Sequence, residues 1–179
     1  MHRLRIPLLL ILGFGALQAG ETPLNVAELF VAPQHLRLVQ QSDKVDVCIL
    51  RHIPPATRPD GSVDRRTERY EETAFTPVPA AMATALRDLV LNDKTYDWKA
   101  GGGGRKPQFY LRLRFHHGAE SVAVDFCFLC HVLSVTKQGE ELGHANFGRN
   151  GDLFLQAFLK IFPDDAPLKH AAQEAGVIP

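Results

Sequence analysis

The stretch QFYLRLRFHHGAESVAVDFCFL, residues 108–129, decides the fold of this chain. It contains two runs in which apolar side chains alternate with polar or small ones, a pattern typical of β-strands with one buried face. Gly118-Ala119 lies between the runs and suits a two-residue hairpin turn with glycine first. We therefore expect Gln108–His117 to pair antiparallel with Glu120–Leu129.

One register of this hairpin sets apolar residues opposite apolar residues. Counting outward from His117 opposite Glu120, the pairs on the buried face are Phe115–Val122, Leu113–Val124, Leu111–Phe126 and Phe109–Phe128. The same register predicts a polar face that contains Tyr110, Arg112, Arg114 and Asp125, with Arg112 opposite Asp125. That face could hold an anionic ligand or a partner protein, although an ordinary solvated sheet face has the same pattern.

A second hairpin is expected to follow, with Gln138-Gly139 as its turn, Lys137 opposite Glu140 and Val135 opposite Leu142. Its apolar positions, Leu133 and Val135, are odd, whereas those of the preceding strand are even. A period of two cannot change parity without an extra residue or a turn. The sequence therefore predicts a break between Phe128 and Leu133, where Cys130 and His131 lie.

The remaining segments predict an α+β fold. Apolar stripes indicate helices at Pro79–Leu91 and Asp152–Phe162. The other expected elements are short helices after Asn25 and from Pro33, a strand at Lys44–Arg51 and an irregular segment from Pro54 to Glu68. We expect an antiparallel sheet of four to five strands, with the two main helices packed on its apolar face.

The N-terminus predicts export. Arg3 and Arg5 precede an apolar run from Ile6 to Leu17 and the small residue Ala19, as in a secretory signal peptide. The run is shorter than the about 20 apolar residues that cross a bilayer. We expect residues 1–19 to be removed as a signal peptide and residues 20–179 to form a single domain. The mature protein would be periplasmic or secreted, without a membrane anchor.

The net charge limits the classes of partner that the sequence predicts. The chain has 20 basic and 20 acidic residues, and loss of the two arginines in the signal peptide leaves a slight acidic excess. A slightly acidic protein does not attract polyanions, so the charge gives no reason to expect nucleic acid or an anionic membrane surface as the partner. No paired carboxylates or Ser-His-Asp constellation stand out. We therefore expect a binding or interaction protein rather than an enzyme, with an unknown protein or small ligand as its partner.

The segment Cys127-Phe128-Leu129-Cys130-His131 allows four interpretations. As a haem c attachment motif, its thiols would hold the haem and His131 would ligate iron, but such motifs usually lie at a helix end. As a thiol–disulfide enzyme, it would use Cys127 as nucleophile with Arg112 and Arg114 nearby, but no helix is indicated after Cys130. As a zinc site, it would need ligands among His116, His117, His131 and His144 and lacks a second paired motif.

The fourth interpretation is a structural disulfide that pins the predicted break, and we favour it because the context for the other three is missing. No cofactor is then expected, and a redox role through haem or thiols is the alternative function. Cys127 and Cys130 should lie close enough to bond, whereas Cys48 should be a buried, unpaired thiol on another strand. A loop this short gains little chain entropy from closure, so its bond should be relatively easy to reduce.

Three motifs resemble a group of small exported bacterial proteins of unknown function. They are Val124–Cys130, Gly143–Phe147 and Phe162–Asp165, and the similarity extends over residues 109–168. Some members of the group carry another cysteine before the first hairpin strand, where this sequence has Gly101–Gly104. In the group, the position after the second cysteine need not be histidine. The resemblance implies an α+β fold and no known activity.

Overall fold

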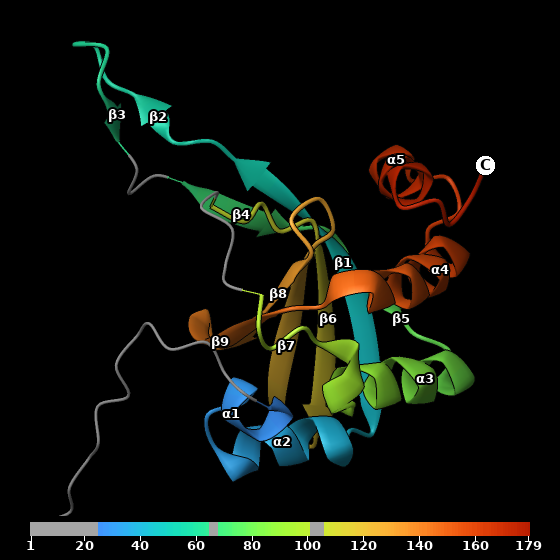
Figure 1. Ribbon diagram of the computed structural model, residues 1–179. Coiled ribbons are helices and arrows are strands. Elements are labelled where there is room, and N and C mark those ends of the chain that lie inside the picture. The colour runs from blue at the N-terminus through green and yellow to red at the C-terminus, as the bar shows by residue number, and fades with distance from the viewer. Residues whose placement is uncertain (1–24, 65–67, 101–105) are drawn as a thin grey trace, which may run out of the picture.

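The computed structural model describes residues 25–64, 68–100 and 106–179 (Figure 1). Its helices are α1 (Val26–Leu29), α2 (Pro33–Gln40), α3 (Ala80–Leu91), α4 (Gly151–Ile161) and α5 (Ala166–Glu174), with 3-10 turns η2 (Asp93–Thr95) and η3 (Gly148–Asn150). Its strands are β1 (Lys44–Ile53), β2 (Ala56–Thr57), β3 (Val63–Asp64), β4 (Arg69–Glu72), β5 (Thr76–Pro77), β6 (Leu111–His117), β7 (Glu120–Cys127), β8 (Val132–Lys137) and β9 (Glu140–Asn146). The predicted signal peptide lies outside the described residues.

The main sheet confirms the α+β class but has more strands than the four to five expected. It contains seven antiparallel strands in the order β4-β1-β6-β7-β8-β9, with β5 also paired to β1, and β2 and β3 form a separate hairpin. The additional strands were missed because β4 spans four residues and β5 two, too short for an alternating pattern. The β2–β3 hairpin projects beyond the end of β1, away from the helices (Figure 1).

The central hairpin has the predicted register from His117–Glu120 to Leu111–Phe126. The predicted inward residues from Leu111 to Phe128 are buried. Phe109 is the exception, and its predicted pairing with Phe128 is wrong. Strand β6 begins at Leu111, and the Phe109 N–H donates instead to the Tyr70 hydroxyl on β4 at 3.3 Å. Phe109 is therefore half-buried against the ring of Tyr70.

The second hairpin follows the prediction at its turn, where Lys137 pairs with Glu140, but not beyond it. A bulge between Val135 and Thr136 sets Val135 opposite Gly143 rather than Leu142. Gly143 lies against α1, and a Cβ atom there would be 2.6 Å from the Leu29 carbonyl oxygen. The bulge thus places Gly143, which has no side chain, where α1 lies against β9.

The predicted break is a turn at Phe128–His131 that joins β7 to β8. Within it, Cys127 and Cys130 form a disulfide, with their Cα atoms 5.6 Å apart. Cys48 on β1 is unpaired and buried. All three cysteines therefore have the predicted states. Burial, and secondarily the charge of Glu72, raises the pKa of the Cys48 thiol to about 12, which keeps it protonated and unreactive.

The predicted main helices share one core with the sheet, which confirms their placement. Leu86 of α3 and Phe154 and Phe158 of α4 are fully buried in it. The ring of Phe126 on β7 lies 4.9 Å from that of Phe154 and 5.3 Å from that of Phe158. α1 and α2 lie together across one end of the sheet, and α4 and α5 lie next to one another nearer the other end of β1 (Figure 1).

The helix starts follow capping rules. The Asn25 side chain accepts a hydrogen bond from the Glu28 N–H, and Pro33 opens α2, as predicted. α5 was not predicted; Asp165 caps it by accepting from the Leu168 N–H at 2.9 Å. Among the described helices, none has the length and apolar character needed to cross a membrane.

Candidate binding cleft beside the disulfide turn

A mainly apolar cleft of about 600 Å³ lies where the core opens at one end of the sheet. Its walls come from β1, the chain before β6, the β7–β8 turn and α5. The side chains on which the following argument depends are Ile49, Phe109, Tyr110, Phe128, Leu129 and Leu168. Its volume is in the range of small-molecule sites, which are usually concave and largely apolar.

Tyr110 and Asp165, which both line the cleft, form a polar contact with each other. The Tyr110 hydroxyl donates to Asp165 Oδ2 at 2.7 Å, while Oδ1 of the same carboxylate caps α5. Burial raises the pKa of Tyr110, and the bond to Asp165 raises it further, so the phenol remains a proton donor. This contact ties α5 to the sheet and fixes the width of the cleft between them.

Basic side chains lie at the rim. Arg51, His52 and His170 all line the cleft. His52 Nε2 lies 2.9 Å from Glu68 Oε1, whereas Arg51 and His170 are exposed. The cleft therefore combines an apolar interior with polar groups at its edge, as ligand sites commonly do.

The disulfide turn supplies one wall. Phe128 is nearly buried, with its ring 5.9 Å from that of Phe147 and 6.0 Å from that of Phe158. Leu129 is 74% exposed. Both also line a second cavity of about 250 Å³ between the turn, α4 and α5. The turn thus separates two cavities with a pair of apolar side chains.

Among the predicted polar-face residues, the structure brings together Arg112, Arg114 and Asp125 but not Tyr110. Arg112 donates from Nε and Nη2 to the two oxygens of Asp125, each at 2.6 Å. The Asp125 side chain is 5% exposed. Burial raises the pKa of Asp125 and the bonds from Arg112 oppose that rise, while the same bonds hold the pKa of Arg112 above its ordinary value. Tyr110 lies in the cleft instead.

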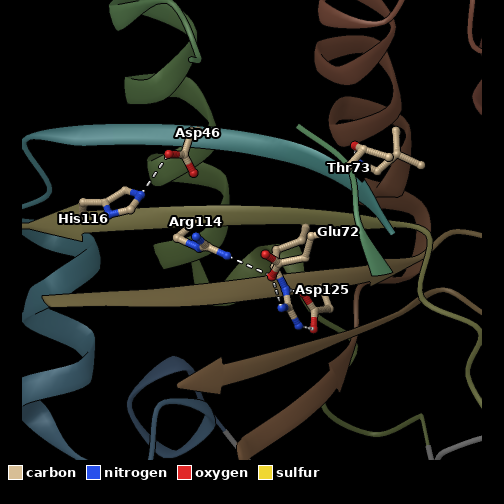
Figure 2. Close-up of polar contacts among 8 residues, drawn as sticks. Asp46, Glu72, Thr73, Arg114, His116 and Asp125 are labelled. Carbon is tan, nitrogen blue, oxygen red and sulfur yellow. Dashed lines mark hydrogen bonds and ion pairs between the residues drawn. The ribbon is translucent and has the colours of Figure 1, made fainter. Parts of the chain in front are cut away.

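Glu72 closes this polar network from β4. Its Oε1 accepts from Arg112 at 2.6 Å and from Arg114 at 2.9 Å, and Figure 2 shows the Arg114 and Glu72 side chains pointing toward one another. The guanidinium carbon of Arg114 also lies 3.9 Å from the centre of the Phe75 ring. Because the two arginines face two carboxylates, the network is balanced in charge and fastens the 72–75 segment onto the sheet.

The other end of β6 carries a separate pair. His116 Nε2 lies 3.0 Å from Asp46 Oδ2, two residues along β6 from Arg114 (Figure 2). Lys44 Nζ contacts the same oxygen at 3.0 Å, and the buried Oδ1 of Asp46 has no hydrogen-bond partner in the described part of the chain. The His116 contact joins β1 to β6, and none of these three residues lines the cleft.

The segment Cys127–His131 does not fit a c-type haem. Both sulfurs are bonded to each other, and the motif lies in a hairpin turn rather than at a helix end. The exposed His131 ring lies 6.0 Å from the ring of Phe147. Within residues 25–64, 68–100 and 106–179, no group of three or more His, Cys, Asp or Glu side chains could hold a metal ion.

The cleft itself is not predictable from the sequence pattern. Asp165 and Pro167 form a recognisable helix start, Asp at the cap and Pro in the first turn, which could have revealed α5. No sequence signal indicated that Tyr110 and Phe109 leave the strand pattern. Comparison with protein-family models, with curated proteins and with solved structures finds no match to this chain.

Proposed function

We propose that this protein is an exported, non-catalytic binding protein that holds a small, largely apolar ligand in the cleft beside the disulfide turn. The observation that carries the proposal is the cleft of about 600 Å³ with apolar walls and a polar rim. Export is supported by the signal-peptide pattern of residues 1–19.

The size of the cleft favours a small molecule over a protein surface. A volume of this order encloses most of a ligand of drug-like size. The walls around Phe109, Phe128 and Leu168 offer apolar contact, and burial of apolar ligand surface contributes about 25 cal/mol per Å². The polar face, in contrast, has its arginines paired with carboxylates, which leaves it less suited to capturing an anion.

The alternative function, a redox protein that uses Cys127 and Cys130, has less support. Catalytic thiols usually lie at a helix N-terminus, where the helix dipole lowers the thiol pKa. Here the two cysteines lie at a hairpin turn between β7 and β8. We therefore assign the turn to the wall of a binding site rather than to an active site.

Titration with the fluorescent apolar probe N-phenyl-1-naphthylamine tests the binding proposal. We expect saturable binding to the wild-type protein. Leu129→Asp should weaken it about tenfold, because the substitution puts a charge on an apolar wall. Leu153→Asp is the matched control, since Leu153 is 46% exposed on α4 and does not line the cleft.

The control variant should bind the probe like the wild type. Absence of saturable binding to the wild-type protein, or equal weakening by the two substitutions, would contradict the proposal. Circular dichroism of each variant verifies that the fold is retained.

A further inference from the structure

We propose that the Cys127–Cys130 disulfide is a site of thiol–disulfide exchange with a dithiol, and that its redox state sets the affinity of the adjacent cleft. This inference rests on the proposed function, because it concerns regulation of the same cleft. Three features of the turn carry it: the residues that the disulfide ring encloses, their unequal packing, and the unequal exposure of the two cysteines.

The disulfide ring encloses part of the cleft wall. Phe128 and Leu129 are the two residues between the cysteines, and both line the large cleft and the smaller cavity. The residue after the ring, His131, has φ +52°, so the chain turns in the left-handed conformation immediately after Cys130. Cleavage of the disulfide removes the covalent constraint from this turn.

The two enclosed side chains are held to different degrees. The Phe128 ring packs against Phe126, Phe147 and Phe158, at centroid distances from 5.8 to 6.0 Å. Leu129 is 74% exposed and has no such packing. Opening the ring should thus leave Phe128 in the core and allow Leu129 to move, which alters the wall shared by the two cavities.

The exposure of the cysteines sets the course of the exchange. Cys127 is 3% exposed, whereas Cys130 is partly exposed and is therefore the more accessible of the two. A thiolate of the dithiol attacks Cys130 Sγ, the S–S bond breaks, and Cys127 leaves with the electron pair and takes up a proton. The second thiolate of the dithiol then attacks its partner sulfur in the mixed disulfide and releases Cys130. In total, two electrons and two protons pass from the dithiol to the protein.

Binding and reduction should then be coupled in both directions. If the oxidised turn shapes the cleft, reduction weakens ligand binding, and bound ligand makes the disulfide harder to reduce by the same factor. Couplings between sites in proteins commonly amount to about fivefold or more. We expect a coupling of at least about fivefold between binding and reduction, because Leu129 itself lines the cleft.

The test is a titration of the full-length mature protein with N-phenyl-1-naphthylamine, before and after complete reduction by dithiothreitol without oxygen. We expect the reduced protein to bind the probe at least about fivefold more weakly than the oxidised protein does. Alkylation after unfolding, followed by mass spectrometry, verifies the state: one modified cysteine in the oxidised protein and three in the reduced protein. A second titration, of the disulfide in dithiothreitol redox buffers, should need more reductant when the probe is bound.

Two variants sharpen the result. The double variant Cys127→Ser, Cys130→Ser should bind as weakly as the reduced wild type and should not respond to dithiothreitol. Leu129→Ala retains the disulfide, and reduction should change its affinity by less than about twofold, below the coupling expected of the wild type. If the double variant fails to fold, the redox-buffer titration of the wild type decides instead.

The outcomes separate this inference from the function on which it rests. If the oxidised protein binds the probe saturably and the fully reduced protein binds equally well, the redox control is overturned and the binding function stands. A Leu129→Ala variant that responds to reduction like the wild type also overturns it. If the oxidised protein does not bind the probe, the proposed function itself fails.

Discussion

Arg112 and Asp125, opposite each other on β6 and β7, illustrate how a single cross-strand pair satisfies a buried charge. The Asp125 side chain is 5% exposed, and both of its oxygens accept from Arg112. Removal of one partner leaves the other charge buried without compensation. We predict that Arg112→Met lowers the free energy of unfolding by about 3–5 kcal/mol, measured by urea denaturation.

The double variant Arg112→Met, Asp125→Leu is the control for this pair, because it removes both charges. It should recover most of the lost stability, since well-packed apolar residues often replace a buried ion pair without cost. A single variant as stable as the wild type would show that solvent compensates Asp125.

The lowered pKa of Glu72, which bonds to the same Arg112, predicts that the stability of the protein depends on pH. Burial opposes its ionisation, but the bonds from Arg112 and Arg114 prevail and lower its pKa below the ordinary value of 4.5. A carboxyl with a lowered pKa in the folded state stabilises the fold above its unfolded pKa, and this stabilisation is lost as the pH falls through the folded pKa. The wild type should therefore exceed Glu72→Gln in stability at about pH 7 and lose that advantage below about pH 4.5.

Urea denaturation of both proteins at several pH values between about 3 and 7 measures this difference. Asp125 titrates in both proteins, and loss of the Glu72 charge removes one cause of its raised pKa, so the measured difference includes this smaller contribution. A difference that grows on acidification would contradict the assigned direction of the pKa.

Between elements, the contact of α1 with β9 depends on Gly143. A Cβ atom at this position would lie 2.6 Å from the Leu29 carbonyl oxygen, which belongs to backbone and cannot swing aside. Gly143→Ala must therefore displace α1 from the strand. We predict a loss of about 1–3 kcal/mol in the free energy of unfolding, typical of overpacking.

The neighbouring substitution His144→Ala is the matched control for this contact. His144 is exposed and bonds to the exposed Glu141, so its loss should change stability by less than about 0.5 kcal/mol. Equal effects of the two substitutions would indicate that α1 does not constrain β9.

At the scale of the whole molecule, the described residues form one sheet and its helices around a shared core, with the β2–β3 hairpin projecting from it (Figure 1). The N-terminal pattern predicts that this protein works after export and removal of residues 1–19. We expect mass spectrometry of the exported protein to show a start near Gly20. A chain recovered outside the cytoplasm with Met1 intact would contradict cleavage.

The sequence alone determined the hairpin of β6 and β7 and the break after Phe128, and it favoured the pairing of Cys127 with Cys130. These features are local, because alternation with period two and short turns are set by neighbouring residues. The same holds for α3 and α4, whose apolar stripes are visible in single segments. In each case the signal spans enough residues to be read without knowledge of distant contacts.

Only the tertiary structure shows that the cleft forms and where the residues around it lie. Phe109 leaves the predicted core because its N–H binds Tyr70, which lies 39 positions earlier, and Tyr110 turns to Asp165, 55 positions later. Other contacts likewise join segments far apart in the chain. β4 and β5 pair with β1, α1 packs against Gly143, and Glu72 bonds to Arg112 and Arg114. Such contacts arise from packing between whole elements, and no local periodicity records which elements will meet.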